Sequence, residues 1–587
     1  MKNKLLYIIA SAALIFALPS CLDEVVYSSI GEFEDSNDGA DQAVTGAYSQ
    51  FLNDMFRWDH FPAVLDYDND YITGPDWALR YLGAGNFQSG NYDYSTDPLW
   101  DHVYVLIHRA NAGIESIEKM NNVDAKRKAN NIGELKFLKA LGYFWLVRAY
   151  GEIPVHYKSV NAGSDFNQPR QPIATVYKHI TELLLDAESE IYKNTDGSFR
   201  KGHASAGTAA GLLAKVYLTM ASGSADEGTQ IIVKGGKARN SDNSFTDPQA
   251  NTFQSKKVEG YVFDKSSTEL FTLARNKAFE VMSGNFGNYD LLPYDQLWSI
   301  AGRGGAEHLF SVQPKDGDNE YGLRLSWYYT GTEDASGMII DGLIIGCRDH
   351  WYKLFESNDL RIVKGVMHRF IDKSYHESWN GGGFYPNNKE WSIMARGFYE
   401  ENGDSIYNDP VTGQPYIKDA MFNDGRQYVC DQEATPDKYI AHLMKYYYAT
   451  DRTKIRSDVP FPVLRYADIL LIFAEAENEV NPLSADAFDA LNKVRTRSYA
   501  SAKSTTNIST KMEFRSEVLD ERARELALEG DRRWDLIRWG IYLDVMNKIG
   551  TDEASVNKTR EKKHLLFPIP VSEMLTNKAI TNNNFGW

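Results

Sequence analysis

Paired helical patterns constrain the fold of this chain more than any other feature of its sequence. The segment "ELKFLKALGYFWLVRAYG" places bulky apolar residues at a spacing of three to four and stops at Gly151. The segments "TVYKHITELLLDAESEIY" and "GTAAGLLAKVYLTMAS" follow, an amphipathic helix and then a helix rich in Ala and Gly. Small residues on a helix face let neighbouring helices approach closely. The alternation predicts a mostly α fold, a tetratricopeptide-like helix-hairpin solenoid with irregular spacing between its pairs.

Further helices are expected on both sides of these segments. Asp97 and Pro98 are typical of an N-cap followed by proline at the first helical position, ahead of a long periodic segment. Near the C-terminus, "RYADILLIFAEAENEV" precedes a segment in which Ser484 has the place of an N-cap. These last two segments form another helix pair.

Three regions lack the helical periodicity. Residues 50–100, 285–350 and 370–435 carry glycine clusters and scattered aromatic residues, which is typical of loops and short strands. Binding residues concentrate on loops that a rigid base supports. Since no low-complexity linker divides the chain, we predict a single domain over 21–587, with these regions as long irregular insertions that carry the ligand-binding loops.

The N-terminus has the pattern of an exported protein. Residues 1–20 begin with lysines, continue through an apolar run and end in small residues before Cys21, as a secretory signal peptide does. The apolar run is shorter than the roughly 20 residues of a membrane span. Cleavage before Cys21 predicts a lipoprotein, anchored by acyl chains on that cysteine. Cys347 and Cys430 then remain, as one disulfide or as two buried thiols.

Charge and motifs argue against several classes of function. The 63 basic and 80 acidic residues give a formal net charge of -17, which argues against nucleic acid as a partner. Motifs of metal and serine hydrolases, such as His-Glu-x-x-His and Gly-x-Ser-x-Gly, are absent from the sequence. "DYDND" at 66–70 alternates carboxylates as calcium loops do, but Tyr71 stands where an EF-hand needs glycine. We predict no catalytic residue, no metal and no cofactor, with a structural calcium ion at this loop as the alternative.

A dense charged segment lies close to the C-terminus. "RELALEGDRRWDLIRWG", at 524–540, contains four arginines, two tryptophans and four acidic residues. It could form an anion-binding patch, a catalytic array or a buried ion-pair network. On a helix, Glu525, Glu529 and Arg533 fall at intervals of four, and Arg538, four residues after Trp534, lies within cation–π reach of it if that segment is also helical. Such pairs fit a structural network that locks one helix against the next.

The segments quoted so far share an order with a known family. Together with Cys21, "ALNKVRTR" and the tail "FPIPVSEMLTNKAITNNNFGW", they resemble the SusD/RagB family of outer-membrane nutrient-uptake lipoproteins over nearly the whole chain. The resemblance implies a lid on a SusC-like TonB-dependent transporter that binds glycans, in some members peptides, and performs no chemistry. It also implies an outer-membrane lipid anchor at Cys21 and display on the cell exterior. Because the charged segment belongs to the pattern shared irrespective of ligand, the resemblance favours its scaffold interpretation.

Two stretches combine the residue types that a glycan site needs. Sugar rings present apolar C–H faces that stack on aromatic rings, and hydroxyls that bind polar side chains. Aromatic residues make up 13% of the chain, and we expect many of their rings at the surface. The stretches "DYDNDYITGPDWALRYL" and "GLRLSWYYTG" supply the predicted ligand-binding residues Asp68, Trp77, Arg80, Tyr81, Arg324, Trp327 and Tyr328. The alternative is that these rings pack beneath their own loops.

Two other classes of function remain open at this point. A surface glycoside hydrolase needs two carboxylates about 5–9.5 Å apart, and 80 acidic residues do not exclude such a pair. A pure adaptor would contact only the transporter. An assay distinguishes the three classes. A hydrolase releases product from polysaccharide, a binding protein binds ligand without turnover, and an adaptor does neither. Glycan and peptide both stay open as ligands.

The lipid anchor is directly testable. We expect Cys21→Ser to abolish acylation and to release the protein from the membrane fraction, since no other segment of the sequence would hold it there. Membrane fractionation and mass spectrometry of the N-terminus measure both effects. A serine variant that stays tightly membrane-bound with an unprocessed N-terminus would contradict the lipoprotein prediction.

Overall fold

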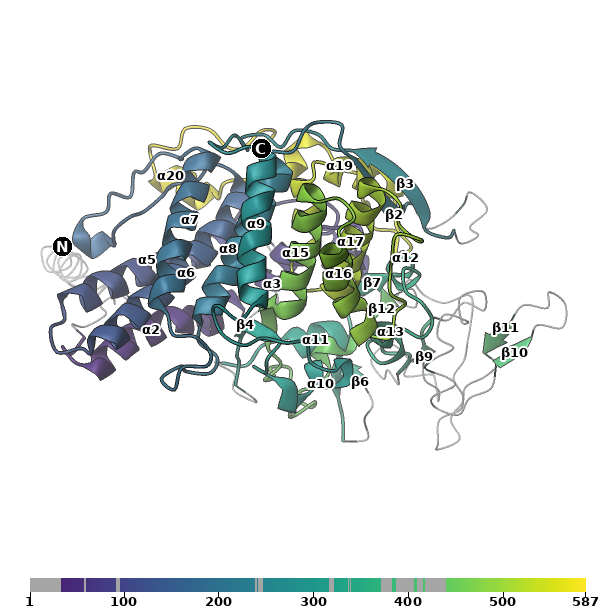
Figure 1. The fold of residues 1–587 in the computed structure, drawn as a ribbon, viewed down its shortest axis with the longest axis horizontal. Helices are drawn as coiled ribbons and strands as arrows, with labels where there is room; N and C mark the ends of the chain where they lie inside the picture. The colour runs from purple at the N-terminus through teal and green to yellow at the C-terminus, as the bar shows by residue number, and fades with distance from the viewer. Residues whose placement is uncertain are drawn as a thin grey trace, which may run out of the picture.

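A computed structural model gives the fold of the chain (Figure 1). It describes residues 33–56, 60–90, 95–237, 240, 246–315, 321–335, 337, 339–370, 383–386, 398, 406–408, 415–417 and 440–587. The predicted signal peptide at 1–20, the lipidation site Cys21 and Cys430 lie outside the described residues, as does most of the predicted insertion at 370–435. Among the residues described, no helix is both long and apolar enough to cross a membrane. Cys347 is buried and makes no disulfide with a described residue.

The scaffold is a row of long helices that pack side by side, as Figure 1 shows from α2 to α17. Each helix packs on the next in the order α2, α5, α6, α7, α8, α9, α15, and α15 also contacts α16 and α17. The prediction of a mostly α, helix-hairpin architecture is confirmed. The bounds of these helices are α2 Asn37–Gln50, α5 Asp97–Lys119, α6 Ala125–Tyr150, α7 Ile173–Glu190, α8 Ala206–Gly223, α9 Ser267–Met282, α15 Tyr466–Val480, α16 Ala485–Arg497 and α17 Lys511–Glu525.

Local sequence signals explain where these helices begin and end. Gly151 follows α6 with φ of 71°, a left-handed conformation that glycine adopts without a Cβ clash. Ser484 caps α16 by accepting from the Ala487 backbone N–H at 3.2 Å, as predicted. The predicted cap of α5 is wrong by one residue. Asp97 lies inside the helix, and its carboxylate accepts instead from the Gly90 backbone N–H at 2.6 Å.

Small residues bring the helices together as the sequence predicts. A Cβ on Gly211 of α8 would lie 2.9 Å from Ile469 Cδ1 of α15, so a larger residue would push the two helices apart. A Cβ on Gly142 of α6 would lie 3.0 Å from Val103 Cγ1 of α5. The close approach of neighbouring helices therefore depends on these positions.

Strands and short helices fill the long connection between α9 and α15, residues 283–465, which includes the segment 285–350 that the sequence analysis expects to be an insertion. In Figure 1, α10, α11 and β6 lie at the lower edge of the row, while β7, β12 and α13 lie towards its right-hand end. The strands, all paired antiparallel, are β1 Ile72–Thr73, β2 Gln230–Gly235, β3 Gln249–Gln254, β4 His308–Val312, β5 Thr332–Glu333, β6 Ile339–Asp341, β7 Gly346–Arg348, β8 Arg369–Phe370, β9 Gly383–Phe384, β10 Ile406–Asn408, β11 Pro415–Ile417, β12 Ile440–Ala441 and β13 Phe461–Arg465.

The strand order is β1-β7-β12 in one sheet, and β13-β4, β2-β3, β5-β6, β8-β9 and β10-β11 in two-stranded sheets. The shorter α and π helices are η1 Phe51–Met55, α3 His60–Asp66, α4 Asp76–Leu79, α10 Tyr294–Leu297, α11 Leu325–Thr330, α12 Asp349–Tyr352, α13 Leu360–Val363, α18 Arg532–Arg538, α19 Tyr542–Ile549 and α20 Val571–Thr576. The single-turn 3₁₀ helices are η2 Val160–Ala162, η3 Ile300–Gly302, η6 Met444–Tyr446 and η7 Lys562–Leu565.

The charged segment at 524–540 is a buried ion-pair network, as its scaffold interpretation predicts. Arg465 lies at its centre, 2.6 Å from Glu307, 2.9 Å from Glu525 and 2.8 Å from Glu529. Glu525 also binds Arg497 at 2.6 Å. All five side chains are at most 6% exposed, so this segment offers no open anion-binding patch.

Glu525, Glu529 and Arg533 do not share the face of a single helix. The chain leaves α17 at Glu525 and enters α18 at Arg532, with φ of 61° at Leu528 and 82° at Gly530 between them. Positive φ breaks a right-handed helix, so Glu529 turns towards Arg465 instead of following Glu525 along one face. The guanidinium of Arg538 lies over Trp539 at 5.7 Å, not over Trp534 as predicted.

Removing one carboxylate from this network tests its contribution to stability. We expect Glu525→Gln to lower the free energy of unfolding by about 3–5 kcal/mol, because buried guanidinium groups then lose a charged partner. Chemical denaturation measures the change. Glu182→Gln is the matched control. Its carboxylate is 60% exposed and 4.0 Å from Lys178, so we expect a change below about 1 kcal/mol.

The same variant should alter the pH dependence of stability. Burial alone raises the pKa of Glu525, but Arg497, Arg465 and Arg361 more than offset it and hold the pKa well below its usual value. A depressed pKa stabilises the folded chain above the unfolded value of about 4.3, and this stabilisation is lost as pH falls. The difference between wild type and Glu525→Gln should therefore shrink below about pH 4. A difference that stays constant down to the acid transition would contradict this assignment.

Candidate functional site

The fold brings the two predicted ligand-binding stretches together, and α11 of the second stretch lies at the lower edge of the helical row (Figure 1). Strand β1, ahead of Trp77, pairs with β7, with Thr73 opposite Gly346. A Cβ on Gly74 would lie 2.6 Å from Ile345 Cδ1 and 3.0 Å from the Ile344 carbonyl oxygen. The Ile344 backbone N–H donates in turn to the Tyr328 carbonyl of α11 at 2.7 Å. The loop that carries Trp77 therefore packs on the segment that holds α11.

Trp77 presents a large ring to solvent. Its side chain is 42% exposed, and among the tryptophans that the structure describes no other is classed as exposed. Arg80 is also exposed and Tyr81 is half-buried. The turn that follows is ordered by the Asn86 side-chain amide, which donates to the Arg80 carbonyl at 2.6 Å. Three of the seven predicted residues thus lie at or near the surface on one short, fixed loop.

Trp327 and Arg324 form the second part of the candidate site. The Arg324 guanidinium lies 4.1 Å from the centroid of the Trp327 ring, a cation–π contact, and both side chains are half-buried. The Trp327 ring also meets Tyr328 edge-on at 4.8 Å. Its indole Nε1 is buried without a hydrogen-bond partner among the described residues. An indole N–H usually finds a partner when buried, so this donor is a candidate for ligand contact.

Asp68 is not available to a ligand, which corrects its predicted role. It is 2% exposed, and its carboxylate binds Arg560 at 2.7 Å and also Arg533. Burial alone raises the pKa of Asp68, but the charges of Arg560 and Arg533 outweigh it and hold the pKa below its usual value. Asp68 is therefore a structural carboxylate, held in its charged form by two arginines.

Tyr328 is corrected in the same way. It is 2% exposed and packs between Trp327 and Tyr67, whose ring centroid lies 6.4 Å away. For this ring the alternative interpretation, packing beneath its own loop, describes the structure.

Two of the three aspartates of "DYDND" bind arginines. Asp70 binds Arg532 through both oxygens, at 2.9 and 2.7 Å, and Asp68 is occupied as described above. Asp66 is buried, and burial raises its pKa to about 7. A carboxylate that binds calcium has to be ionised, so this raised pKa argues against a calcium site at Asp66. No group of three or more metal-ligating side chains occurs among the described residues.

Sequence reasoning missed a third segment beside α11. Arg452 donates to the Thr330 hydroxyl at 2.9 Å and to the Thr330 carbonyl at 3.0 Å, which ties residues 447–452 to the end of α11. Its guanidinium lies 4.1 Å from the Tyr447 ring centroid, and the adjacent Tyr448 is 36% exposed. The only sequence signal is the tyrosine run "KYYYAT" at 445–450, more than 100 residues from α11.

The fold and this site define a helical scaffold that displays aromatic and cationic side chains at one edge. Two family models match the chain, one described as "SusD family" over residues 363–587 and one as "Starch-binding associating with outer membrane" over residues 21–218. The chain belongs to the SusD/RagB family.

Individual relatives match different shares of the chain. SusD-like protein P25 of Formosa agariphila is 25% identical over 610 residues, which covers 99% of this chain and 100% of the relative. The starch-binding protein SusD of Bacteroides thetaiotaomicron is 34% identical over 129 residues, 22% of this chain and 21% of that protein.

Solved structures share the fold. A SusD homolog from Bacteroides thetaiotaomicron matches with a TM-score of 0.67 and 21% identity, over 94% of this chain and 98% of the other. Surface glycan-binding protein A from the same species, solved in complex with laminarihexaose, matches with a TM-score of 0.61 and 16% identity, over 94% and 99%.

Proposed function

We propose that this protein is a lipid-anchored, non-enzymatic binding protein on the outer face of the outer membrane, which captures glycan and delivers it to a TonB-dependent transporter. The exposed Trp77, on a loop that packs against the segment holding the Arg324–Trp327 pair, carries the proposal of a glycan ligand. The family description "Starch-binding associating with outer membrane" and the laminarihexaose complex of a structural neighbour support the same class of ligand.

The predicted residues that stay accessible suit a sugar chain. Trp77 and the half-buried Trp327 offer apolar faces for C–H groups, while Arg80 and Arg324 offer donors for ring hydroxyls. Burying one ring face contributes roughly 1.5–3 kcal/mol, and association costs several kcal/mol. Two or three such contacts imply an affinity of about micromolar to millimolar, weak enough for release to a partner.

Two carboxylates near the site are already held by arginines, which favours a binding role without turnover. Glu333, two residues beyond Gly331 at the end of α11, is bound by Arg452 at 3.1 Å. Asp68 is buried between two arginines. Glycoside hydrolysis needs two carboxylates that can reach the scissile bond. Neither of these side chains is placed to serve as one of them.

The tryptophan site is tested by affinity. We expect Trp77→Ala to weaken glycan binding tenfold or more and to leave the melting temperature nearly unchanged, because the ring is exposed. Trp327→Phe keeps an aromatic ring beside Arg324 but removes the indole N–H, so we expect a smaller loss of affinity. Glycan and peptide arrays with the soluble chain that begins after Cys21, followed by calorimetry on the best ligand, give the measurement.

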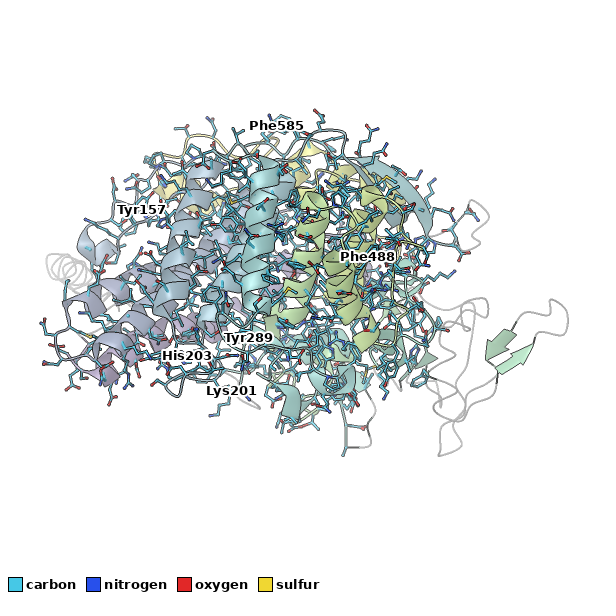
Figure 2. The ribbon with its side chains drawn as sticks, in the orientation of Figure 1. Tyr157, Lys201, His203, Tyr289, Phe488 and Phe585 are labelled. Carbon is cyan, nitrogen blue, oxygen red and sulfur yellow. The ribbon has the colours of Figure 1, made fainter. Side chains whose placement is uncertain are left out.

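Phe585→Ala is the matched control for this test. Phe585 is 69% exposed and lies at the upper edge of the molecule, opposite the edge that carries α11 (Figures 1 and 2). Normal glycan binding by both tryptophan variants would place the site elsewhere. Binding to peptides alone would replace glycan by peptide as the ligand, and release of shortened sugars would contradict a binding role.

Delivery requires a partner in the same membrane. We expect the native protein to co-purify with a TonB-dependent transporter when membranes are dissolved in mild detergent, because a lid that hands over ligand gains from a stable contact. Affinity isolation and mass spectrometry identify the partner. Repeated isolation of the chain alone would argue for capture without direct delivery.

A further inference from the structure

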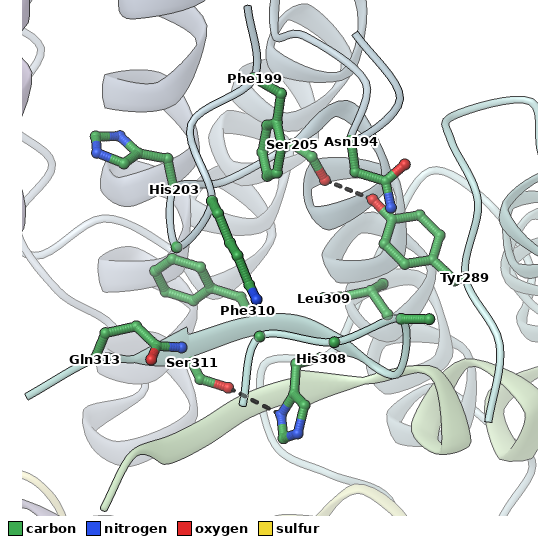
Figure 3. Close-up of a pocket in the computed structure, with 15 residues that line it drawn as sticks. Asn194, Phe199, His203, Ser205, Tyr289, His308, Leu309, Phe310, Ser311 and Gln313 are labelled. Carbon is green, nitrogen blue, oxygen red and sulfur yellow. Dashed lines mark hydrogen bonds between the residues drawn. The ribbon is translucent and has the colours of Figure 1, made fainter. Parts of the chain in front are cut away.

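A second ligand-sized feature opens between the α7–α8 connection and strand β4 (Figure 3). It is a pocket of about 320 Å³. Ligand pockets in proteins span about 300–1,000 Å³, so this one has room for a small group. Its walls include the rings of Phe199, Tyr289 and Phe310 and the side chains of Asn194, Lys201 and Gln313. None of these residues belongs to the tryptophan site described above.

Hydrogen bonds and tight packing fix one wall of the pocket. The Tyr289 hydroxyl lies 2.6 Å from Ser205 Oγ, as the dashed line in Figure 3 shows, and Ser205 also caps the N-terminus of α8. A Cβ on Gly207 would lie 2.3 Å from a carbon of the Tyr289 ring, so the ring packs directly on the α8 backbone. The Asn194 amide is held by the Asn288 backbone, donating at 2.7 Å and accepting at 2.9 Å. The pocket is therefore formed without a ligand.

The charge of the lining is positive, although the whole chain carries -17. No Asp or Glu lines the pocket, while Lys201 does. Within the described part of the chain, the Lys201 ammonium has neither an ion pair nor a hydrogen bond. The carboxylate behind the lining, Glu134, is already bound by His203 at 2.7 Å and by Arg200 at 3.4 Å. Lys201 is exposed, so water solvates its ammonium, which stays accessible to an anionic ligand.

His308, the second histidine that lines the pocket, is neutral near pH 7. Burial, reinforced by the charge of Arg465, lowers the pKa of His308 to about 4. Its ring nitrogens lie 3.2 Å from the Leu297 carbonyl and 3.3 Å from the Ser311 hydroxyl. The carbonyl fixes Nε2 as a donor, so Nδ1 accepts from Ser311. The positive charge facing the pocket therefore comes from Lys201.

We propose that this pocket binds one anionic sugar unit, a ring that carries a carboxylate or a sulfate group, with the anion at Lys201 and the ring between Phe199 and Tyr289. Phe199 is half-buried, with no ring contact in the described structure, and so leaves a face for sugar C–H groups. Asn194 and Gln313 supply amides for hydroxyls. The proposal rests on the proposed function only in taking the ligand to be a saccharide.

The pocket lies on the same edge of the molecule as the tryptophan site. Figure 2 shows Lys201, His203 and Tyr289 at the lower edge, where Figure 1 shows α11. Strand β4 ends at Val312, and three residues later the Lys315 backbone N–H donates to the Tyr321 carbonyl at 3.0 Å, shortly before α11. A polysaccharide with occasional acidic units can therefore contact the tryptophan site and the pocket along one edge.

The test uses the soluble chain that begins after Cys21 and an array of neutral, uronate-containing and sulfated oligosaccharides, together with acidic peptides. We expect acidic glycans to bind wild type, and Lys201→Ala to weaken that binding tenfold or more while neutral glycans bind as before. Lys201→Arg should retain most of the affinity. Comparison of the uronate and sulfate members shows which anion the pocket takes.

Lys257→Ala is the matched control, since Lys257 is an exposed lysine in a loop outside the pocket and its loss changes the net charge equally. An equal effect of both variants would mean general charge attraction and would overturn the proposal. Binding of neutral glycans only, or acidic glycan binding that ignores Lys201→Ala, would also overturn it.

The outcomes separate this inference from the proposed function. Absence of any glycan binding would contradict both. If Lys201→Ala weakens glycan binding and Trp77→Ala does not, the result would support the pocket and reject the tryptophan site. Lys201-dependent binding of acidic peptides without glycans would assign the pocket to a peptide carboxylate and overturn the saccharide proposal.

Discussion

The buried guanidinium of Arg465 fixes the geometry on which the rest of the molecule depends. It joins Glu307, directly before β4, to Glu525 at the end of α17 and to Glu529 in the turn that follows. Removing a guanidinium from water costs several kcal/mol. Carboxylates offset that cost only when they accept hydrogen bonds from all of its N–H donors at the same time. The strand pair β4–β13 and the C-terminal helices therefore have one favourable arrangement, and β4 leads from there to the binding edge.

A second set of arginines does the same for the loop that carries Trp77. Arg532, Arg533 and Arg560 bind Asp70 and Asp68, more than 460 residues earlier in the chain. These aspartates lie just ahead of β1 and α4, so the exposed tryptophan stands on a base that the C-terminal scaffold holds in place. A ring that is already fixed loses little conformational entropy when a ligand stacks on it. The densest charged segment of the sequence thus acts on ligand binding through position, without touching the ligand.

The helices could be predicted from the sequence because their signals are local. A three-to-four spacing, Gly151 after α6 and Ser484 before α16 each act within a few residues. Burial of the charged segment was also predictable, but its path was not. A left-handed Leu528 breaks the helix, and nothing in a leucine indicates that conformation.

The candidate site was predictable only in part, because exposure is set by distant segments. Asp68 and Trp77 lie nine residues apart on one stretch, yet arginines from the C-terminal part of the chain bury the first and leave the second exposed. Tyr447 and Arg452 reach α11 from more than 100 residues away. The expectation that many aromatic rings lie at the surface is wrong for most of the tryptophans described, which are buried or half-buried in the scaffold.

The paired cations of the interior contrast with two donors at the candidate binding edge that are unpaired within the described structure. Buried cations such as Arg348, Arg465 and Lys215 are each bound by carboxylates, and buried hydroxyls and amides mostly have partners. The two donors lie at the same edge, one on the half-buried Trp327 and one on the exposed Lys201. The Trp327 indole N–H has no acceptor, and the Lys201 ammonium has no anion, among the described residues. An edge that combines exposed rings with unused donors is chemically complementary to a hydroxyl-rich, partly anionic ligand.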